Sequence, residues 1–276
     1  MDSAAAGRPA RAARWVVWMT LSDKLAERDL DWIIPDWPAP ANVQSLMTTR
    51  NGGASSGHCA TMNLAGNHAD DPQHVERNQA LLREVIGIEP RWLSQVHGTD
   101  VAMVDAPAQR WVADAAIATT PGIAAAVRVA DCLPVLFCDR DGTRVAAAHA
   151  GWRGLAAGVL ERTVEAMRVP PGGIIAWLGP AIGPAAFEVG DDVRDAFIAH
   201  EAGAAVAFAA YPGRPGKWLA DLFALASQRL RKAGVESISG GGVCTYSNPD
   251  RFFSYRRDKS PGRMAALVWL KPTSTG

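Results

Sequence analysis

The chain has 276 residues, 48% of them hydrophobic and 20% charged, so it is long enough to bury a large core without disulfide or metal staples. Its 28 basic and 28 acidic residues cancel, and a net charge of zero gives no overall field that would attract nucleic acid or an anionic membrane. The four cysteines form no Cys-x-x-Cys pair, which argues against a disulfide-rich secreted domain. We therefore expect a cytoplasmic protein with a small-molecule partner, and both a monomer and a homodimer remain open.

The amino-terminal region contains no pattern typical of a targeting or membrane segment. Its apolar stretch over residues 15–19 is too short for a signal-peptide core or a membrane span. We predict a disordered extension over residues 1–22, a single catalytic domain over 23–271 and a tail over 272–276. No repeat, low-complexity tract or linker divides the middle of the chain, which favours one domain over two.

The first predicted elements are a strand and a helix separated by a long loop. Residues 43–49 form the strand, which ends at the turn signal Arg50-Asn51-Gly52-Gly53, and the polar, glycine-rich residues 52–71 form the loop. Asp71 is the expected N-cap of a helix that begins at Pro72 and extends to Ile86. Short strands are then predicted over residues 92–96, 101–104 and 115–119.

The middle of the chain is almost continuously apolar. Residues 123–138 predict a strand that is buried on both faces and interrupted near Cys132. A second buried strand over 145–149 leads into a glycine-rich turn over 151–154 and a helix over 155–167. The remaining predicted elements are strands over residues 174–178, 241–245 and 265–270, and helices over residues 191–200 and 218–233. This mixture predicts a single α+β domain without giving its strand order.

Two imidazoles and one thiol lie at the predicted strand ends or beside turns. They are His97, Cys132 and His149, and loops at strand ends are where a rigid scaffold presents reactive groups. Three N/S ligands leave the fourth tetrahedral position of a zinc ion open, as in catalytic zinc sites. Each residue taken alone also fits a structural role, and the spacings match no standard zinc ribbon or finger.

Eight motifs, running in the same order from about residue 43 to residue 270, resemble the YfiH/DUF152 family. This family is also called the laccase-domain or multicopper polyphenol oxidoreductase family, and the peptidoglycan editing factor family. The motifs are Thr48-Thr49-Arg50-x-Gly52-Gly53, Met62-Asn63-Leu64, His68-x-Asp70-Asp71-Pro72, Gln95-Val96-His97-Gly98, Ala130-Asp131-Cys132-Leu133-Pro134-Val135, His149-Ala150-Gly151-Trp152-Arg153-Gly154, Gly179-Pro180-x-Ile182-Gly183-Pro184 and Phe252-Phe253-Ser254-Tyr255-Arg256-Arg257-Asp258.

The resemblance implies a zinc enzyme that acts on purine nucleosides. Its expected reactions are phosphorolysis of adenosine, inosine, guanosine and methylthioadenosine, and hydrolytic deamination of adenosine. It implies that His97, Cys132 and His149 hold the metal, which agrees with the ligand set suggested by the residues themselves. It also implies two mixed β-sheets packed as a sandwich, with helices outside.

The two reactions make different demands on the remaining residues. Deamination needs an activated water and a general base. The His-x-Glu and Pro-Cys-x-x-Cys motifs of zinc deaminases are absent from this chain. The general base would therefore have to be Asp131 or a residue behind the ligands. Phosphorolysis needs cations that hold phosphate beside the ribose. Arg50, Arg153 and Arg256 (or its neighbour Arg257) are the candidates, although each also fits a structural ion pair or turn contact.

Three further polar residues are candidates for substrate binding. Asn63 could contact ribose or base, His68 could line the site, and Gln95 stands two residues before the predicted ligand His97. Asn63 is equally suited to stabilise a turn, and His68 to pack at a helix cap.

Two other chemistries use the same residues. A copper polyphenol oxidase would need many imidazoles, including His-x-His pairs, whereas this chain has six histidines and no such pair. A metal-free amide hydrolase acting on peptidoglycan precursors would use Cys132 as nucleophile and His149 as base. Metal content separates the hydrolase from the zinc enzyme, because a thiolate bound to metal is a poor nucleophile.

Overall fold

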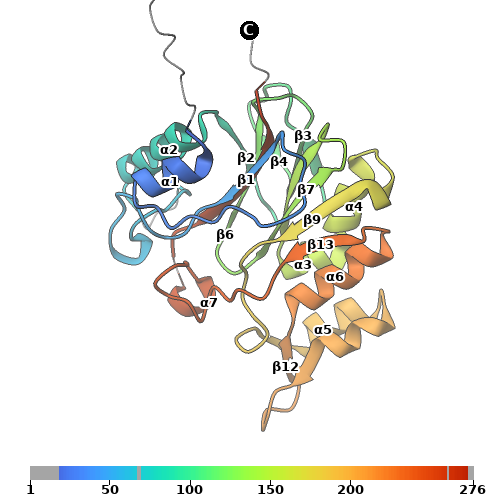
Figure 1. The fold of residues 1–276 in the computed structure, drawn as a ribbon. Coiled ribbons are helices and arrows are strands. Elements are labelled where there is room, and N and C mark those ends of the chain that lie inside the picture. Colours follow the sequence, from blue (N-terminus) through green and yellow to red (C-terminus); the bar gives the residue numbers. More distant parts are fainter. Residues whose placement is uncertain (1–18, 67–69, 260, 273–276) are drawn as a thin grey trace, which may run out of the picture.

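Two β-sheets lie face to face in the computed structural model, which describes residues 19–66, 70–259 and 261–272 (Figure 1). One has five strands in the order β1-β14-β6-β2-β4, and the other has six in the order β13-β9-β7-β8-β5-β3. The five strands of the first sheet are β1 Val43–Met47, β14 Met264–Leu270, β6 Ala124–Val129, β2 Pro90–Ser94 and β4 Trp111–Val112. The strands of the second are β13 Ser237–Gly240, β9 Ile174–Leu178, β7 Leu133–Asp139, β8 Val145–Ala150, β5 Ala115–Ala118 and β3 Val101–Met103. The expected sandwich of mixed sheets and the α+β class are confirmed.

A small third sheet and a set of helices surround the sandwich. The third sheet consists of β10 Glu188–Gly190, β12 Lys217–Ala220 and β11 Phe208–Ala210. The α-helices are α1 Leu21–Glu27, α2 Pro72–Ile86, α3 Trp152–Ala157, α4 Val159–Ala166, α5 Asp191–Ile198, α6 Leu222–Lys232 and α7 Tyr255–Asp258. Short 3-10 helices are η1 Gly57–Cys59, η2 Pro171–Gly173 and η3 Ala202–Ala207. None of the described helices is both long and apolar enough to cross a membrane.

Strand alternation explains the central core. In β6, Ala125 and Val127 face the opposite sheet, while Ala124 and Ala126 face away from it toward α1 and α2. In β7, Leu136 points between the sheets and Val135 points to the outer helices. Both faces of these strands are therefore buried, which is the physical reason for their almost continuous apolar sequence.

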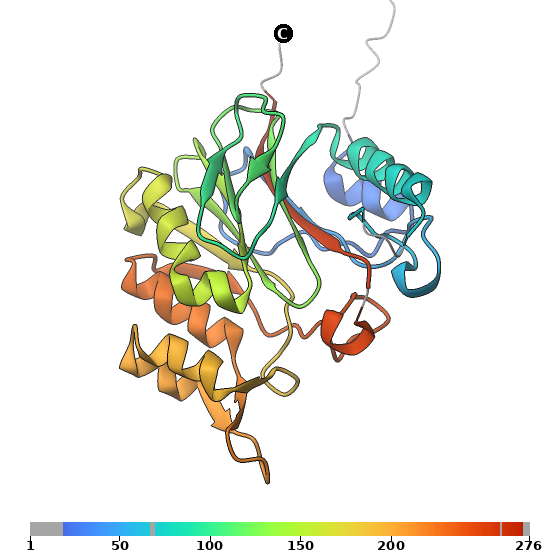
Figure 2. The same cartoon turned by 180° about the vertical axis from the view of Figure 1, so that it is seen from behind.

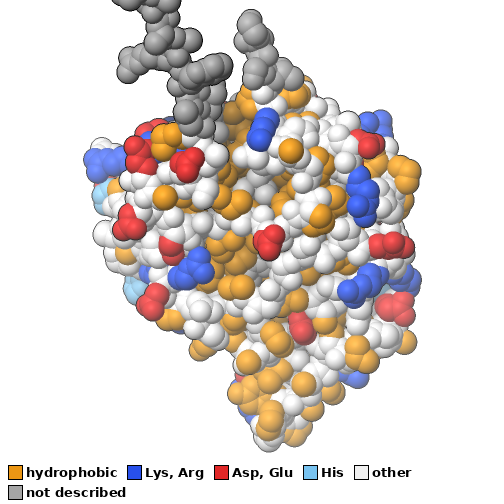
Figure 3. All heavy atoms as spheres, viewed as in Figure 1, with side chains coloured by type: hydrophobic (Ala, Val, Ile, Leu, Met, Phe, Trp, Pro, Cys, Tyr) orange, Lys and Arg blue, Asp and Glu red, His pale blue; other side chains and the backbone are white. Residues whose placement is uncertain are grey.

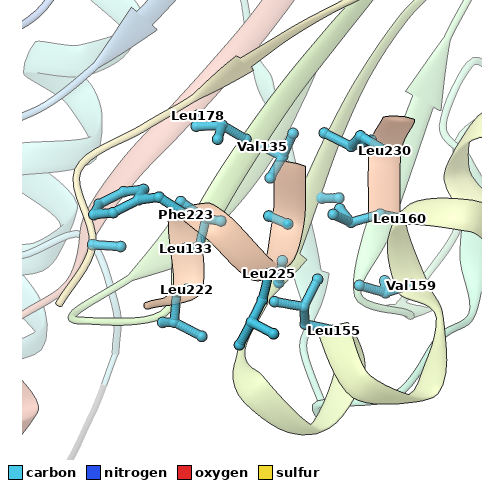
Figure 4. Close-up of a cluster of buried hydrophobic side chains, with 14 of the residues drawn as sticks. Leu133, Val135, Leu155, Val159, Leu160, Leu178, Leu222, Phe223, Leu225 and Leu230 are labelled. Carbon is cyan, nitrogen blue, oxygen red and sulfur yellow. The ribbon is translucent and has the colours of Figure 1, made fainter. Parts of the chain in front are cut away.

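Helices cover the outer face of each sheet. Seen from behind, α1 and α2 lie against one side of the sandwich and α3, α4 and α6 against the other, with α5 farther out beside the small third sheet (Figure 2). In the close-up, Leu225 and Leu230 of α6 and Leu155 of α3 belong to one buried cluster with Leu133 and Val135 of β7 (Figure 4). These helices hold the outer face of the six-stranded sheet, whose strand β8 carries the second predicted histidine ligand, His149.

Several predicted elements differ from the structure. Residues 123–138 are not one strand: β6 and β7 belong to opposite sheets, and the chain crosses between them at Asp131, which has a positive φ of 87°. The helix expected over 155–167 begins at Trp152 and is split into α3 and α4 by Gly158, whose φ is 103°.

Two other differences have tertiary causes. The helix expected over 218–233 begins only at Leu222, because the preceding segment pairs with β10 and β11 as β12. The strand expected over 241–245 is absent, and the parallel partner of β9 is the earlier segment β13. By contrast, α2 and β9 have the predicted bounds.

The predicted domain spans residues 23–271, after a predicted extension over residues 1–22. Helix α1 begins at Leu21 and is capped by the side chain of Thr20, which accepts a hydrogen bond from Asp23 N. Residues 1–18 of the predicted extension and 273–276 of the predicted tail lie outside the described residues.

Candidate metal site and substrate cavity

The three predicted ligands come together at the end of the sandwich where α3 and α7 lie (Figure 1). The ligand atoms of His97, Cys132 and His149 all lie within 4.8 Å of one another, and Cys132 Sγ is 3.8 Å from His97 Nε2. The two imidazole rings meet edge to face, with centroids 4.7 Å apart. Segments 17 and more residues apart in the sequence thus form one donor cluster.

Each ligand is placed by a different element. His97 follows β2 and has a positive φ of 61°, a conformation that a non-glycine residue keeps only when its surroundings hold it. Cys132 lies in the crossover between the sheets, directly before β7, and His149 is in β8 with only 3% of its surface exposed. The cluster therefore joins a loop to the rigid six-stranded sheet.

Asp114 connects these elements and was missed by the sequence analysis. The fully buried carboxylate accepts hydrogen bonds from the backbone N–H groups of Val96 (3.1 Å), His97 (2.9 Å) and Gly98 (2.7 Å). Its Oδ1 is also 2.8 Å from His149 Nδ1. A carboxylate at Nδ1 leaves His149 Nε2 directed to the cluster, which is how histidine ligands are commonly oriented. Only its position before β5 could have hinted at this role.

The electrostatics of the cluster favour a thiolate. Burial raises the pKa of the Cys132 thiol, but the adjacent His149 and His97 imidazoles outweigh this effect and lower the pKa to about 6. Burial lowers the pKa of His149, but the Cys132 thiolate and Asp114 raise it to about 9. Both shifts describe one thiolate–imidazolium pair, which must release a proton before His149 can ligate a metal.

Glycines allow the cluster to close. A Cβ added to Gly151 would lie 2.9 Å from His97 Cδ2 and 3.0 Å from Cys132 Sγ. A Cβ on Gly154 would lie 2.8 Å from the carbonyl oxygen of Gly98. The glycine-rich turn after β8 is therefore needed for close packing of α3 against the His97 loop.

The donor set fits a metal ion. Bonds of about 2.0–2.3 Å to a tetrahedral zinc place neighbouring N and S atoms about 3.3–3.8 Å apart, and the separation of 3.8 Å between Cys132 and His97 agrees with this geometry. A multicopper oxidase would need sites for several copper ions. Among the described residues, only one group of three or more His, Cys, Asp or Glu side chains could hold a metal, and it is this cluster.

A cavity of about 600 Å³ opens beside the cluster. Its walls come from the ends of β2 and β6, from α3 and from α7. Arg153 and Arg256, two of the predicted phosphate ligands, line it, as does Gln95. Arg153 stacks on Trp152 with a centroid distance of 4.4 Å, and Arg256 donates to the carbonyl oxygen of Glu188 (2.9 Å).

Other predicted site residues lie elsewhere. Arg50 is not among the cavity-lining residues, and its guanidinium donates to the carbonyl oxygens of Ala60 and Pro249, both at 2.9 Å. Asn63 also does not line the cavity. It is fully buried, donates to Asp70 and accepts from Arg263 N, so its amide joins two loops. His68 lies outside the described residues.

Asp131 is unsuited to act as the general base considered from the sequence. Its carboxylate accepts hydrogen bonds from the hydroxyls of Thr245 (2.6 Å) and Ser254 (3.0 Å) and from Arg256 N (2.7 Å). These contacts attach the crossover loop to the N-terminus of α7. Two cavity arginines, Arg128 and Arg263, were also missed, because neither stands in a motif that suggested an anion site.

The charged side chains outside this cavity form no single-sign field on the face shown in Figure 3, where acidic and basic groups are interspersed. This distribution agrees with the net charge of zero. The cationic character of the cavity is therefore local.

A family model described as "multi-copper polyphenol oxidoreductase laccase" matches residues 44–271. A Pseudomonas aeruginosa protein named purine nucleoside phosphorylase is 53% identical over 240 residues, covering 87% of this chain and 98% of the relative. The Escherichia coli protein named purine nucleoside phosphorylase YfiH is 52% identical over 241 residues, covering 86% and 98% of the two chains.

A solved structure is similar over the same region. The crystal structure of Neisseria meningitidis protein NMB0706, assigned to the family model DUF152, superposes with a TM-score of 0.85 at 51% identity. The match covers 88% of this chain and 100% of that one.

Proposed function

Because the chain belongs to the YfiH/DUF152 family, we propose that it is a zinc-dependent purine nucleoside phosphorylase that also deaminates adenosine. Its nucleoside substrates are adenosine, inosine, guanosine and methylthioadenosine. The observation that carries the proposal is the His97, Cys132 and His149 cluster, which opens on a cavity with several arginines. The names of the relatives cited above support the nucleoside substrate.

In phosphorolysis, the bond between ribose C1′ and the purine nitrogen breaks and an oxygen of phosphate bonds to C1′. The electron pair of the broken bond goes to the purine, which takes up a proton and leaves as the free base. Arg153 and Arg256 hold the phosphate for this attack, since guanidinium groups bind phosphate through paired hydrogen bonds. Gln95 lines the cavity and bonds through its amide to the backbone of Arg128, while Arg50 and Asn63 support the surrounding loops.

The metal would be held by His97, Cys132 and His149, and when bound it would supply a Lewis acid with one open position. Asp114 keeps His149 oriented and anchors the His97 loop. In deamination, water adds to the purine C6 and ammonia leaves. The Cys132 ligand must remain a thiolate, which agrees with the reducing cytoplasmic compartment that we propose.

The first test measures bound metal and product formation together. Wild type is expected to contain about one zinc ion per chain, as one three-donor site implies, and to release adenine or hypoxanthine only with phosphate. Cys132→Ala should lose both properties. Cys138→Ala is the matched control, because Cys138 is a fully buried thiol of β7 outside the cluster. Zinc-free wild type, or base release without phosphate, would contradict the proposal.

The geometry also favours one second candidate, an amide hydrolase acting on peptidoglycan precursors. Cys132 lies beside His149, which contacts Asp114 in turn, and this order resembles a nucleophile, base and orienting carboxylate. Metal-free protein that cleaves an amide bond would establish this alternative. Copper in place of zinc, with oxidation of a phenol, would instead support the oxidase chemistry of the family name.

A further inference from the structure

Arg128 is a cavity cation whose charge no described side chain neutralises. It lies near the end of β6 and lines the same cavity as the metal cluster. Within the described part of the chain its guanidinium forms no hydrogen bond or ion pair, and its Nε is buried without a partner. Arg128 is partly buried, and leaving a partly buried cation without a counter-charge is costly, which points to a partner that the folded chain itself does not supply.

The position of Arg128 is fixed by its neighbours. Its backbone N–H donates to Gln95 Oε1 and its carbonyl oxygen accepts from Gln95 Nε2, both at 2.8 Å. Its guanidinium stacks on the ring of Trp92, with Cζ 4.0 Å from the centroid. Stacking holds the planar group while leaving its edge available, so the cation is preorganised for a ligand.

The charges around Arg128 leave the cavity positive. Arg153, Arg256 and Arg263 also line it, and among the described lining residues the one carboxylate is that of Asp131, which already accepts three hydrogen bonds. Burial lowers the pKa of Arg128 to about 10, so the group stays protonated at neutral pH. An anionic ligand is therefore the one that the cavity favours.

A second large cavity differs from this one in how its cations are paired. It measures about 770 Å³, lies among α4, α5 and α6, and contains cations that are paired within the chain. Arg229 Nε is 2.6 Å from Glu161 Oε1, and Lys232 pairs with Glu201. The chain supplies a carboxylate partner for Arg229 and for Lys232, but it supplies none for Arg128 among the described residues.

We infer that Arg128 is a binding residue for the inorganic phosphate co-substrate, together with the arginines at the other walls of the cavity. This inference rests on the proposed phosphorolysis and extends it to a residue outside the family motifs considered above. Phosphate is the anion that the proposed reaction requires in this cavity. A guanidinium can donate two parallel hydrogen bonds to it.

The test compares Arg128→Met with Arg91→Met. Met keeps most of the apolar stem and its packing on the tryptophan but removes the charge. Arg91 is the matched control on β2: it also stacks on a tryptophan, Trp111, and has a buried Nε without a partner, but it does not line the cavity. Arg128→Lys is the second variant, because it retains the charge and loses the planar fork.

Two measurements are made on each variant. The first is stabilisation of the full-length protein against thermal unfolding by inorganic phosphate, relative to potassium chloride at equal ionic strength. We expect phosphate to stabilise wild type and Arg91→Met but not Arg128→Met. The second is steady-state kinetics, in which the KM for phosphate should rise roughly 10- to 100-fold in Arg128→Met, as loss of a charge-assisted hydrogen bond implies, while the KM for nucleoside changes little. Arg128→Lys should show a smaller rise.

The outcomes separate this inference from the proposed function. If wild type is stabilised by phosphate through Arg128 but cleaves no nucleoside, the anion site stands and the proposed function fails. If wild type performs phosphorolysis and Arg128→Met has an unchanged KM for phosphate, the function stands and the inference is overturned. Equal effects of Arg91→Met and Arg128→Met, or a wild type that phosphate does not stabilise, would also overturn it.

Discussion

Asp114 positions two of the proposed metal ligands, His97 and His149, at once. One carboxylate binds the backbone of the His97 loop and the Nδ1 of His149, so a change at this residue reaches both imidazoles. We predict that Asp114→Asn weakens zinc binding by roughly 10- to 100-fold, because the amide cannot accept the same set of hydrogen bonds. Competition with a chromogenic chelator measures this affinity directly.

The control for this substitution is Asp139→Asn. Asp139 is also buried and accepts from Thr143 N, Thr143 Oγ1 and Arg144 N, but it lies at the end of β7 away from the cavity. Both variants should lose stability, and only Asp114→Asn should lose zinc affinity. Equal zinc affinity in the two variants would show that Asp114 merely supports the fold.

At the scale of elements, the turn between β8 and α3 determines how closely the ligands approach. Gly151 has φ −60° and ψ 153°, which alanine adopts without strain, so any effect of Gly151→Ala comes from its Cβ. That atom would contact His97 and Cys132 at 2.9 and 3.0 Å. We predict that Gly151→Ala reduces zinc affinity on the order of tenfold, measured by the same chelator competition.

Gly172→Ala is the corresponding control. Gly172 lies in η2, and a Cβ added there would meet no atom within 4 Å. Its zinc affinity and nucleoside cleavage should equal those of wild type. A Gly151→Ala protein with wild-type zinc affinity would mean that the His97 loop can move aside without loss of the site.

At the scale of the whole molecule, the packing of the two sheets keeps the ligands together. Leu136 of β7 is fully buried between the sheets. We predict that Leu136→Ala lowers the free energy of unfolding by about 2–5 kcal/mol, since it leaves a cavity in the central core. Urea denaturation measures the change. Val206→Ala, at a side chain 82% exposed, should stay within about 0.5 kcal/mol of wild type.

The crossover between the sheets also decides where the site lies. The chain leaves β6 in one sheet and enters β7 in the other, and the link carries Asp131 and Cys132. Asp131 fastens this link to α7, and α7 contributes Arg256 to the cavity. The same connection that closes the sandwich thus brings the thiol and an arginine to one place.

Sequence by itself was sufficient for features that depend on local chemistry. Asp71 with Pro72 marked the start of α2, and the apolar periodicity marked β9, because capping and side-chain alternation act over a few residues. The residue types of His97, Cys132 and His149 were enough to predict a donor set, and the structure brings these three together.

Tertiary structure alone decided the features that depend on residues distant in sequence. Residues 123–138 have the composition of one buried strand, and only pairing with β14 and β8 divides them between two sheets. Asp114 can orient His97 because its carboxylate accepts hydrogen bonds from N–H groups more than ten residues away in the sequence. Arg128 is held at the cavity because its backbone bonds to Gln95, 33 residues away. Arg50 and Asn63 instead form hydrogen bonds with neighbouring loops. Local sequence specifies which groups are present, but which of them face the cavity is determined by long-range hydrogen bonding and packing.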